Sequence, residues 1–284
     1  MKLLAISDLH LGHEANRRAL EALAPHPDDW LIVAGDVAEG EHRLRWALAR
    51  LTARFARVLW VPGNHDLWTP PAERDGARGE GRYRLLVETC REHGVATPED
   101  PWPVWPGPGP RCRIALLFTL YDYSFSPDGM TAAEALAWAA ESGLVCADEL
   151  LLHHDPHPSR EAWCRARCAE SERRLAAASA DGPLVLVNHW PLREDLLTLR
   201  RIPRFSIWCG TRRSEQWHVR FGAVAAVHGH LHVRSSHWRD GVLFHEVSFG
   251  YPRDWDPARG LAPYLRQVLP PAAPPHSAAG PAAR

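Results

Sequence analysis

Residues able to bind metal ions follow several apolar stretches of this sequence. The stretches end in SDLH, GDV, GNHD, NHW and GHLH, each of which supplies a carboxylate, an amide or an imidazole. The residues concerned are Asp8, His10, Asp36, Asn64, His65, His189, His230 and His232. One Asp or His at such a position is more often a turn or capping residue. Five such blocks in one chain instead indicate a shared site.

The chemistry follows from the residue types. Two carboxylates, one amide and four histidines, with His65 beside them, form a nitrogen and oxygen ligand set without cysteine. Such a set suits Mn, Fe, Zn or Co better than Mg or Ca. Seven ligands are too many for one ion with an open position, but suit two ions that share a carboxylate, for which Asp36 is the candidate. Two divalent ions about 3.5–4 Å apart clamp the oxygens of an in-line displacement and hold an activated, bridging hydroxide. Because only two carboxylates offset their charge, we expect the site to attract a phosphate anion.

Strands and helices must position these residues, and the two alternate along most of the chain. Continuous apolar runs, typical of strands covered on both faces, occupy residues 2–7, 30–35, 58–63, 113–120, 183–188, 223–229 and 242–248. Helical patterns occupy residues 14–24, 40–55, 81–94 and 159–180. The alternation predicts an α/β sandwich. Ligands of open α/β sheets bind beyond the carboxyl ends of the strands, so the polar blocks should converge on one edge.

We expect a single domain over residues 1–269. Residues 121–165 and 190–216 fit the alternation poorly and are interpreted as insertions or a lid. Residues 270–284 are rich in Pro and Ala, a composition that predicts a disordered tail.

Composition argues against several partners. Thirty-three basic and 34 acidic residues give a net charge of -1, without the basic excess of a nucleic-acid-binding protein. No apolar run reaches the length of a membrane span, and the N-terminal MKLLAISDLH is too short and too soon charged for a signal peptide. The six scattered cysteines indicate free thiols. We therefore expect a cytoplasmic protein with no membrane partner.

The five blocks together resemble the calcineurin-like metallophosphoesterase superfamily. The resemblance implies an αββα sandwich of two mostly mixed or parallel sheets flanked by helices, with lid-like insertions. It also implies two divalent ions, manganese or iron, alone or mixed with zinc. The implied ligands are Asp8, His10, Asp36 and His232 for one ion and Asp36, Asn64, His189 and His230 for the other.

In this family pattern His65 is not a ligand. It is expected to contact the phosphate and protonate the leaving oxygen, and Asp66 is expected to orient His65 from behind. Relatives often continue the second block as G-D-x-x-D, whereas this chain reads GDVAE, with Glu39 in the last position. We expect this departure to touch no ligand.

Much of the chain also resembles one subgroup, the phosphopantetheinyl hydrolases of actinobacterial type. The similar stretches include VLWVPGNHDLWT, LYDYSFSPDG, PSREAWC, RFSIWCGTRRSEQWHVRF and GHLHVRSSHWRDGVLFHEVSFGYPRDW. This resemblance implies removal of 4′-phosphopantetheine from the serine of an acyl or peptidyl carrier protein. Because the resemblance extends through the insertions, it bears on the choice of substrate.

Two further features could serve such a substrate. Arginines between Arg200 and Arg220 could dock an acidic carrier protein, unless they form a solvated face or internal ion pairs. They are Arg200, Arg201, Arg204, Arg212, Arg213 and Arg220. Six aromatic residues could wall a groove for the pantetheine arm, unless they are ordinary core. They are Tyr121, Tyr123, Phe125, Trp190, Trp208 and Trp217.

Two other functions stay open at this stage. The enzyme could act on nucleotide or other small phosphodiesters, or less readily on DNA or RNA, for which no extended basic and aromatic stripe is present. The fold could also serve as a non-catalytic interaction scaffold, although such a protein would be expected to lose metal ligands or His65.

Overall fold

The computed structural model describes residues 1–70 and 76–271, so residues 272–284 of the predicted tail lie outside the described part. Within it, the strands form a four-stranded sheet of order β3-β2-β1-β9 and a five-stranded sheet of order β4-β5-β6-β8-β7. The first contains β1 (Leu3–Ile6), β2 (His26–Ala34), β3 (Phe55–Val61) and β9 (Arg266–Leu269). The second contains β4 (Arg113–Leu116), β5 (Leu184–Val187), β6 (Ala223–His228), β7 (Ser235–Arg239) and β8 (Val242–Glu246).

Each sheet has a parallel centre and one antiparallel edge strand. β1 pairs in parallel with β2, and β2 with β3, whereas β9 is antiparallel to β1. In the other sheet β4, β5, β6 and β8 are parallel, and β7 is antiparallel to β8. The central strands are continuously apolar because helices and the opposite sheet cover both of their faces. Both edge strands escaped prediction, since SSHWR and RQVL lack an apolar run.

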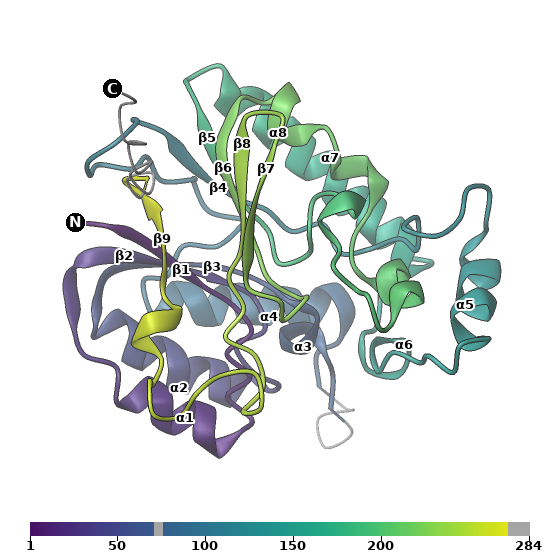
Figure 1. The fold of residues 1–284 in the computed structure, drawn as a ribbon, viewed down its shortest axis with the longest axis horizontal. Helices are drawn as coiled ribbons and strands as arrows, with labels where there is room; N and C mark the ends of the chain where they lie inside the picture. Colours follow the sequence, from purple (N-terminus) through teal and green to yellow (C-terminus); the bar gives the residue numbers. More distant parts are fainter. Residues whose placement is uncertain (71–75, 272–284) are drawn as a thin grey trace, which may run out of the picture.

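Helices flank the two sheets on their outer sides (Figure 1). The first sheet is covered by α1 (Glu14–Glu21), α2 (Glu41–Thr52) and α4 (Gly79–Glu92), and the second by α7 (Arg160–Ser179) and α8 (Trp217–Arg220). One cluster of buried hydrophobic residues includes members of both sheets. The predicted αββα sandwich is confirmed, and the four predicted helices correspond to α1, α2, α4 and α7.

The two segments that broke the predicted alternation contain short elements. Residues 121–165 hold α5 (Ala132–Ala140) and α6 (Asp148–Leu151), which Figure 1 shows to one side of the sheets. Residues 190–216 hold the 3₁₀ helices η2 (Glu194–Leu196), η3 (Pro203–Trp208) and η4 (Arg212–Ser214). Among the described helices, none is both long and apolar enough to cross a membrane.

Candidate metal centre

The structure brings all seven predicted metal ligands together where the carboxyl ends of the two sheets meet. Backbone hydrogen bonds join the sheets there, from Ser7 N to Val247 O (3.1 Å) and from Phe249 N to Ser7 O (2.8 Å). The ligands directly follow β1, β2, β3, β5 and β6 in the chain. The edge position is therefore set by the parallel strands, whose carboxyl ends all face the same way.

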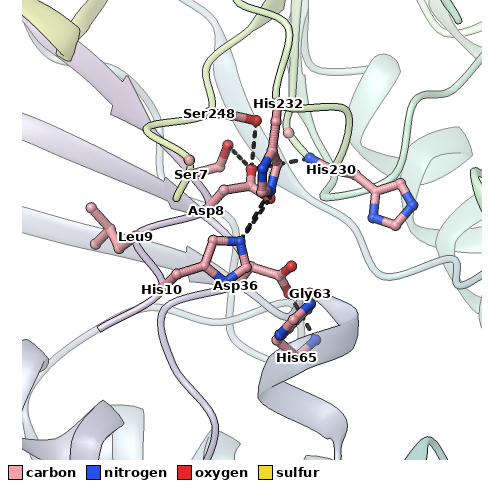
Figure 2. Close-up of polar contacts among 12 residues, drawn as sticks. Ser7, Asp8, Leu9, His10, Asp36, Gly63, His65, His230, His232 and Ser248 are labelled. Carbon is pink, nitrogen blue, oxygen red and sulfur yellow. Dashed lines mark hydrogen bonds and ion pairs between the residues drawn. The ribbon is translucent and has the colours of Figure 1, made fainter. Parts of the chain in front are cut away.

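The first cluster consists of Asp8, His10 and His232 (Figure 2). His232 Nε2 lies 3.1 Å from Asp8 Oδ1 and 3.0 Å from His10 Nε2. The other oxygen of Asp8 accepts hydrogen bonds from Ser7 Oγ (2.6 Å), Ser248 Oγ (2.7 Å) and the backbone N–H of His230 (3.0 Å). These contacts fix the carboxylate so that Oδ1 faces the two imidazoles.

The second cluster contains Asp36, Asn64, His189 and His230. His189 Nε2 lies 3.4 Å from Asp36 Oδ2, 3.2 Å from Asn64 Oδ1 and 3.2 Å from His230 Nδ1. His189 Nδ1 donates to the carbonyl of Ala34 at 2.8 Å, so Nε2 is the ring nitrogen that faces Asp36, Asn64 and His230. Asp36 links the clusters, because its carboxylate lies within 4.8 Å of ligand atoms of Asp8, His10 and His189.

The donor set fits divalent metal ions. Burial lowers the pKa of His10 to about 4 and that of His230 to about 3, so both rings are neutral at pH 7 and keep a lone pair. Burial also opposes charge on His189, yet the carboxylate of Asp36 raises its pKa to about 10. The cluster therefore favours positive charge at its centre. A divalent cation would supply that charge and satisfy the converging lone pairs.

The backbone is held in an unusual conformation at most of these ligands. Asp8, His10, Asp36, His230 and His232 have φ between 41° and 74°, in the left-handed region that non-glycine residues rarely adopt. Such strain costs roughly 1–3 kcal/mol per residue and is typical of functional sites. A neighbouring glycine allows the close packing, since a Cβ at Gly63 would lie 2.1 Å from Asp36 Oδ1.

His65 stands beside the clusters with a different set of contacts. Its Nδ1 lies 2.8 Å from Glu39 Oε1, and its ring packs on Trp68 with a centroid distance of 3.7 Å. Burial lowers the pKa of His65, but the negative charges of Asp36 and Glu39 outweigh burial, and the pKa lies above the ordinary value. The ring is 13% exposed, enough to reach a molecule in the adjoining pocket.

The partner of His65 differs from the sequence-based expectation. Asp66 Oδ2 accepts hydrogen bonds from the backbone N–H groups of Asp36 and Gly63, both at 2.9 Å, and Oδ1 accepts from Val37 N at 2.9 Å. The hydrogen bonds of the Asp66 carboxylate thus go to backbone N–H groups and tie the loop after β2 to the loop after β3. Glu39, the residue that departs from the family pattern, is the carboxylate that contacts His65. The longer Glu side chain reaches the ring from the loop after β2.

Comparison with known proteins agrees with this geometry. A profile described as calcineurin-like phosphoesterase matches residues 1–234, which is most of the chain. The chain belongs to the calcineurin-like phosphoesterase family. It is a metal-dependent phosphoester hydrolase, and the resemblance stated from the five blocks is confirmed.

A close relative and its crystal structure extend the comparison. The phosphoesterase is 50% identical over 272 residues to the [acyl-carrier-protein] phosphodiesterase PptH of Mycobacterium tuberculosis, covering 94% of this chain and 83% of the relative. The crystal structure of phosphopantetheinyl hydrolase (PptH) from Mycobacterium tuberculosis superimposes with a TM-score of 0.91 at 49% identity. That match covers 96% of this chain and 98% of the other. The likeness thus includes the insertions.

One residue of the phosphoesterase site lies far from the predicted blocks. Asp148, a fully buried residue of α6, accepts hydrogen bonds through Oδ1 from Asn64 Nδ2 (2.9 Å) and Trp68 Nε1 (2.6 Å). The hydrogen bond from Asn64 turns Asn64 Oδ1 toward the second cluster. The hydrogen bond from Trp68 holds the indole that packs on His65. Nothing in the sequence around Asp148 signals this role, because it sits in an insertion without strand or motif.

A buried arginine fixes α6 in turn. Arg160, at the start of α7, donates through Nη2 to the carbonyls of Asp148 (2.9 Å) and Leu152 (2.8 Å) and through Nη1 to Glu149 (2.9 Å). The insertion is therefore connected to the metal ligands of the phosphoesterase by a chain of charge-assisted hydrogen bonds.

A pocket of about 400 Å³ opens over the clusters, and we call it the metal pocket. Its floor includes Asp36, Asn64 and His65, and its rim includes Leu199 and Ile202 from one insertion and Val145 from the other. Val145 is 87% exposed and Ile202 is 40% exposed. The mouth of the phosphoesterase site is thus lined by both insertions, together with Tyr251 and Arg253 from the segment after β8.

The two features predicted to bind substrate have mostly structural roles. Four of the six arginines form internal ion pairs, namely Arg204–Glu141 (2.7 Å), Arg212–Glu194 (3.1 Å), Arg213–Asp122 (3.5 Å) and Arg220–Glu172 (3.0 Å). Among the described residues, only Arg200 and Arg201 of the six have no such pair. The six aromatics are at most 5% exposed, so the predicted aromatic wall is wrong for five of them, and only Phe125 lines a hollow beside the metal pocket.

Proposed function

We propose that this phosphoesterase removes 4′-phosphopantetheine from the serine of an acyl or peptidyl carrier protein. The observation that carries the proposal is the extent of the likeness to the Mycobacterium tuberculosis acyl-carrier-protein phosphodiesterase, which covers 94% of this chain. Because the insertions line part of the mouth of the site, likeness through them bears on substrate in a way that the metal ligands alone do not.

The proposed cofactors are two divalent ions, manganese or iron, alone or mixed with zinc. Asp8, His10 and His232 would hold one, Asn64, His189 and His230 the other, and Asp36 both. When bound, the ions supply positive charge for the phosphate and activate a water molecule for attack.

His65 is the proposed general acid. Contact of its Nδ1 with Glu39 leaves Nε2 as the nitrogen available to the substrate. As the water oxygen bonds to phosphorus, the bond between phosphorus and the serine oxygen breaks, and the His65 proton passes to that oxygen. A serine alkoxide is a poor leaving group near neutral pH, so this proton transfer is expected to contribute about 10²–10⁴-fold. Glu39 and Trp68 keep the ring in place.

Docking of the carrier protein is assigned to the mouth of the metal pocket. Arg200 and Arg201 are exposed and precede Ile202 on its rim, whereas the remaining arginines of the 200–220 stretch are engaged internally. Carrier proteins are usually acidic, so these two guanidinium groups would attract one. Replacing both, Arg200→Glu and Arg201→Glu, should raise KM for the carrier several-fold and leave a small diester unaffected.

The proposed setting is the cytoplasm, where carrier proteins are soluble and thiols stay reduced. All six cysteines are free, and five of them are buried. We propose no membrane or nucleic-acid partner.

The deciding experiment is a manganese-supplemented incubation with a holo acyl carrier protein, followed by intact mass, with bis(p-nitrophenyl) phosphate alongside. Conversion of the holo to the apo carrier, absent in Asp36→Asn, supports the proposal. Cleavage of the small diester with an untouched carrier would overturn it and redirect the search to nucleotide or other small diesters.

A further inference from the structure

A second hollow adjoins the metal pocket. It measures about 710 Å³ and lies between α5 and the segment that joins η2 to η3. Leu199 lines both cavities, so the two hollows meet at this residue. We call the second hollow the arm groove. None of the metal ligands lines it, and the reaction at the metal centre does not by itself explain it.

The arm groove is built by contacts between the two insertions. Ser206 Oγ donates to the carbonyl of Phe125 at 2.6 Å, and Arg212 Nη2 donates to the carbonyl of Ser126 at 3.0 Å. Arg204 pairs with Glu141 at 2.7 Å while its guanidinium lies 4.9 Å from the Trp138 ring centroid. Both walls are therefore held in place before any ligand arrives.

The lining of the arm groove is amphipathic and electrically balanced. Phe125, Trp138, Leu197 and Pro203 give it an apolar wall, and Thr198 adds a hydroxyl. Its charged members are two acids and two arginines, Asp128, Glu194, Arg200 and Arg212, so their charges sum to zero. Arg212 is also neutralised by Asp128 and by Glu194 at 3.1 Å. Such a surface suits a long neutral ligand rather than a second phosphate or a nucleotide.

We propose that the arm groove binds the pantetheine arm of the substrate, an inference that rests on the function proposed above. With the phosphate at the metal centre, the arm passes Leu199 and lies along the groove. Its dimethyl and methylene groups contact the apolar wall, and its amides and hydroxyl meet Thr198 and the exposed backbone. The arm thus contributes binding energy away from the bond that breaks.

The test compares two inhibitors of bis(p-nitrophenyl) phosphate hydrolysis by the metal-loaded enzyme, free 4′-phosphopantetheine and inorganic phosphate. In the wild type, phosphopantetheine should inhibit at least about 10-fold more tightly, equivalent to burying roughly two methylene groups of the arm. Trp138→Ala, which removes part of the wall, and Thr198→Trp, which fills the groove from an exposed position, should each bring the two inhibitors to within about 3-fold. Turnover of the small diester should not change.

Trp238→Ala is the matched control, since Trp238 is 66% exposed on β7 and lines neither cavity. Equal inhibition by phosphopantetheine and phosphate in the wild type would overturn the inference, as would groove variants that keep the wild-type difference. Variants that lose cleavage of the holo carrier but keep tight phosphopantetheine inhibition would assign the groove to the carrier body instead. Inhibition is measured without a carrier protein, so it tests binding of the arm alone. A negative result for the arm groove is therefore distinct from a negative result for cleavage of the holo carrier. Should Trp138→Ala not fold, Thr198→Trp alone decides.

Discussion

The metal centre and the arm groove are neighbours, but different parts of the chain build them. Every proposed ligand of the metal centre follows a strand, and backbone hydrogen bonds between loops hold Asp8, His10 and Asp36. The arm groove comes from the two insertions and is held by side-chain contacts such as Arg204–Glu141 and Ser206–Phe125. The contrast separates two tasks. The sheets position the proposed metal ligands, and under the proposed function the insertions bear on the choice of substrate.

The largest effect is expected at Asp36, which serves both clusters. Asp36→Asn removes the shared negative charge, so metal content should fall from two ions per chain and turnover of any diester should drop by more than about 10⁴-fold. Elemental analysis after dialysis, together with the small-diester assay, checks both expectations. Retention of two ions at wild-type affinity would contradict a shared carboxylate.

His65→Ala should come next and should spare the metals. Turnover of the holo carrier is expected to fall about 10²–10⁴-fold because the serine oxygen leaves without a proton. With bis(p-nitrophenyl) phosphate the loss should be smaller, since p-nitrophenolate departs readily unprotonated. Equal losses for the two substrates, at full metal content, would remove His65 from the role of general acid.

Variants of Asp148 show whether the insertion that carries α6 contributes to metal affinity. Asp148→Ala frees the Asn64 amide and the Trp68 indole, so affinity for manganese should weaken about 10–100-fold. Asp148→Asn keeps a hydrogen-bond acceptor and should lose less. Isothermal titration of the metal-free protein measures both, with exposed Asp181→Ala as the control. Wild-type affinity in Asp148→Ala would show that the sheets alone set the ligand geometry.

The smallest effect is expected at Arg220, which is 57% exposed and paired with Glu172. Surface ion pairs of this kind contribute about 0–1 kcal/mol, so Arg220→Ala should alter neither thermal stability nor cleavage of the carrier noticeably. The measurement is KM for the carrier protein at low salt, compared between Arg220→Ala and the double variant of Arg200 and Arg201. A raised KM for the carrier in Arg220→Ala would extend the docking surface across the whole arginine-rich stretch.

The positions of the residues that follow strands could be predicted from the sequence. Continuous apolar runs locate the strands, and the carboxyl ends of parallel strands lie at one edge of a sheet. Asp8 and His232 could therefore be predicted to lie close together, although 224 positions separate them. The same reasoning could not reveal β7 or β9, whose pairing is decided by the neighbouring strand rather than by their own pattern.

The remaining errors concern side-chain partners. Asp66 follows His65 in sequence, but the short helix α3 (Asn64–Leu67) directs its carboxylate at the amides of the loop after β2, and Glu39 contacts the imidazole instead. The arginines of the 200–220 stretch looked available because their partners, such as Asp122 and Glu172, are distant in sequence. Nothing short of the tertiary fold specifies such pairs.

The left-handed backbone at the metal ligands has an evolutionary consequence. Glycine adopts that conformation at no steric cost, so replacing His10, His230 or His232 by glycine would remove the steric strain of about 1–2 kcal/mol at each position, partly offset by the greater conformational entropy that glycine loses on folding. A chain that did not need these imidazoles could place glycine at all three positions without steric strain. Histidine at each of them therefore supports a functional role for the three side chains.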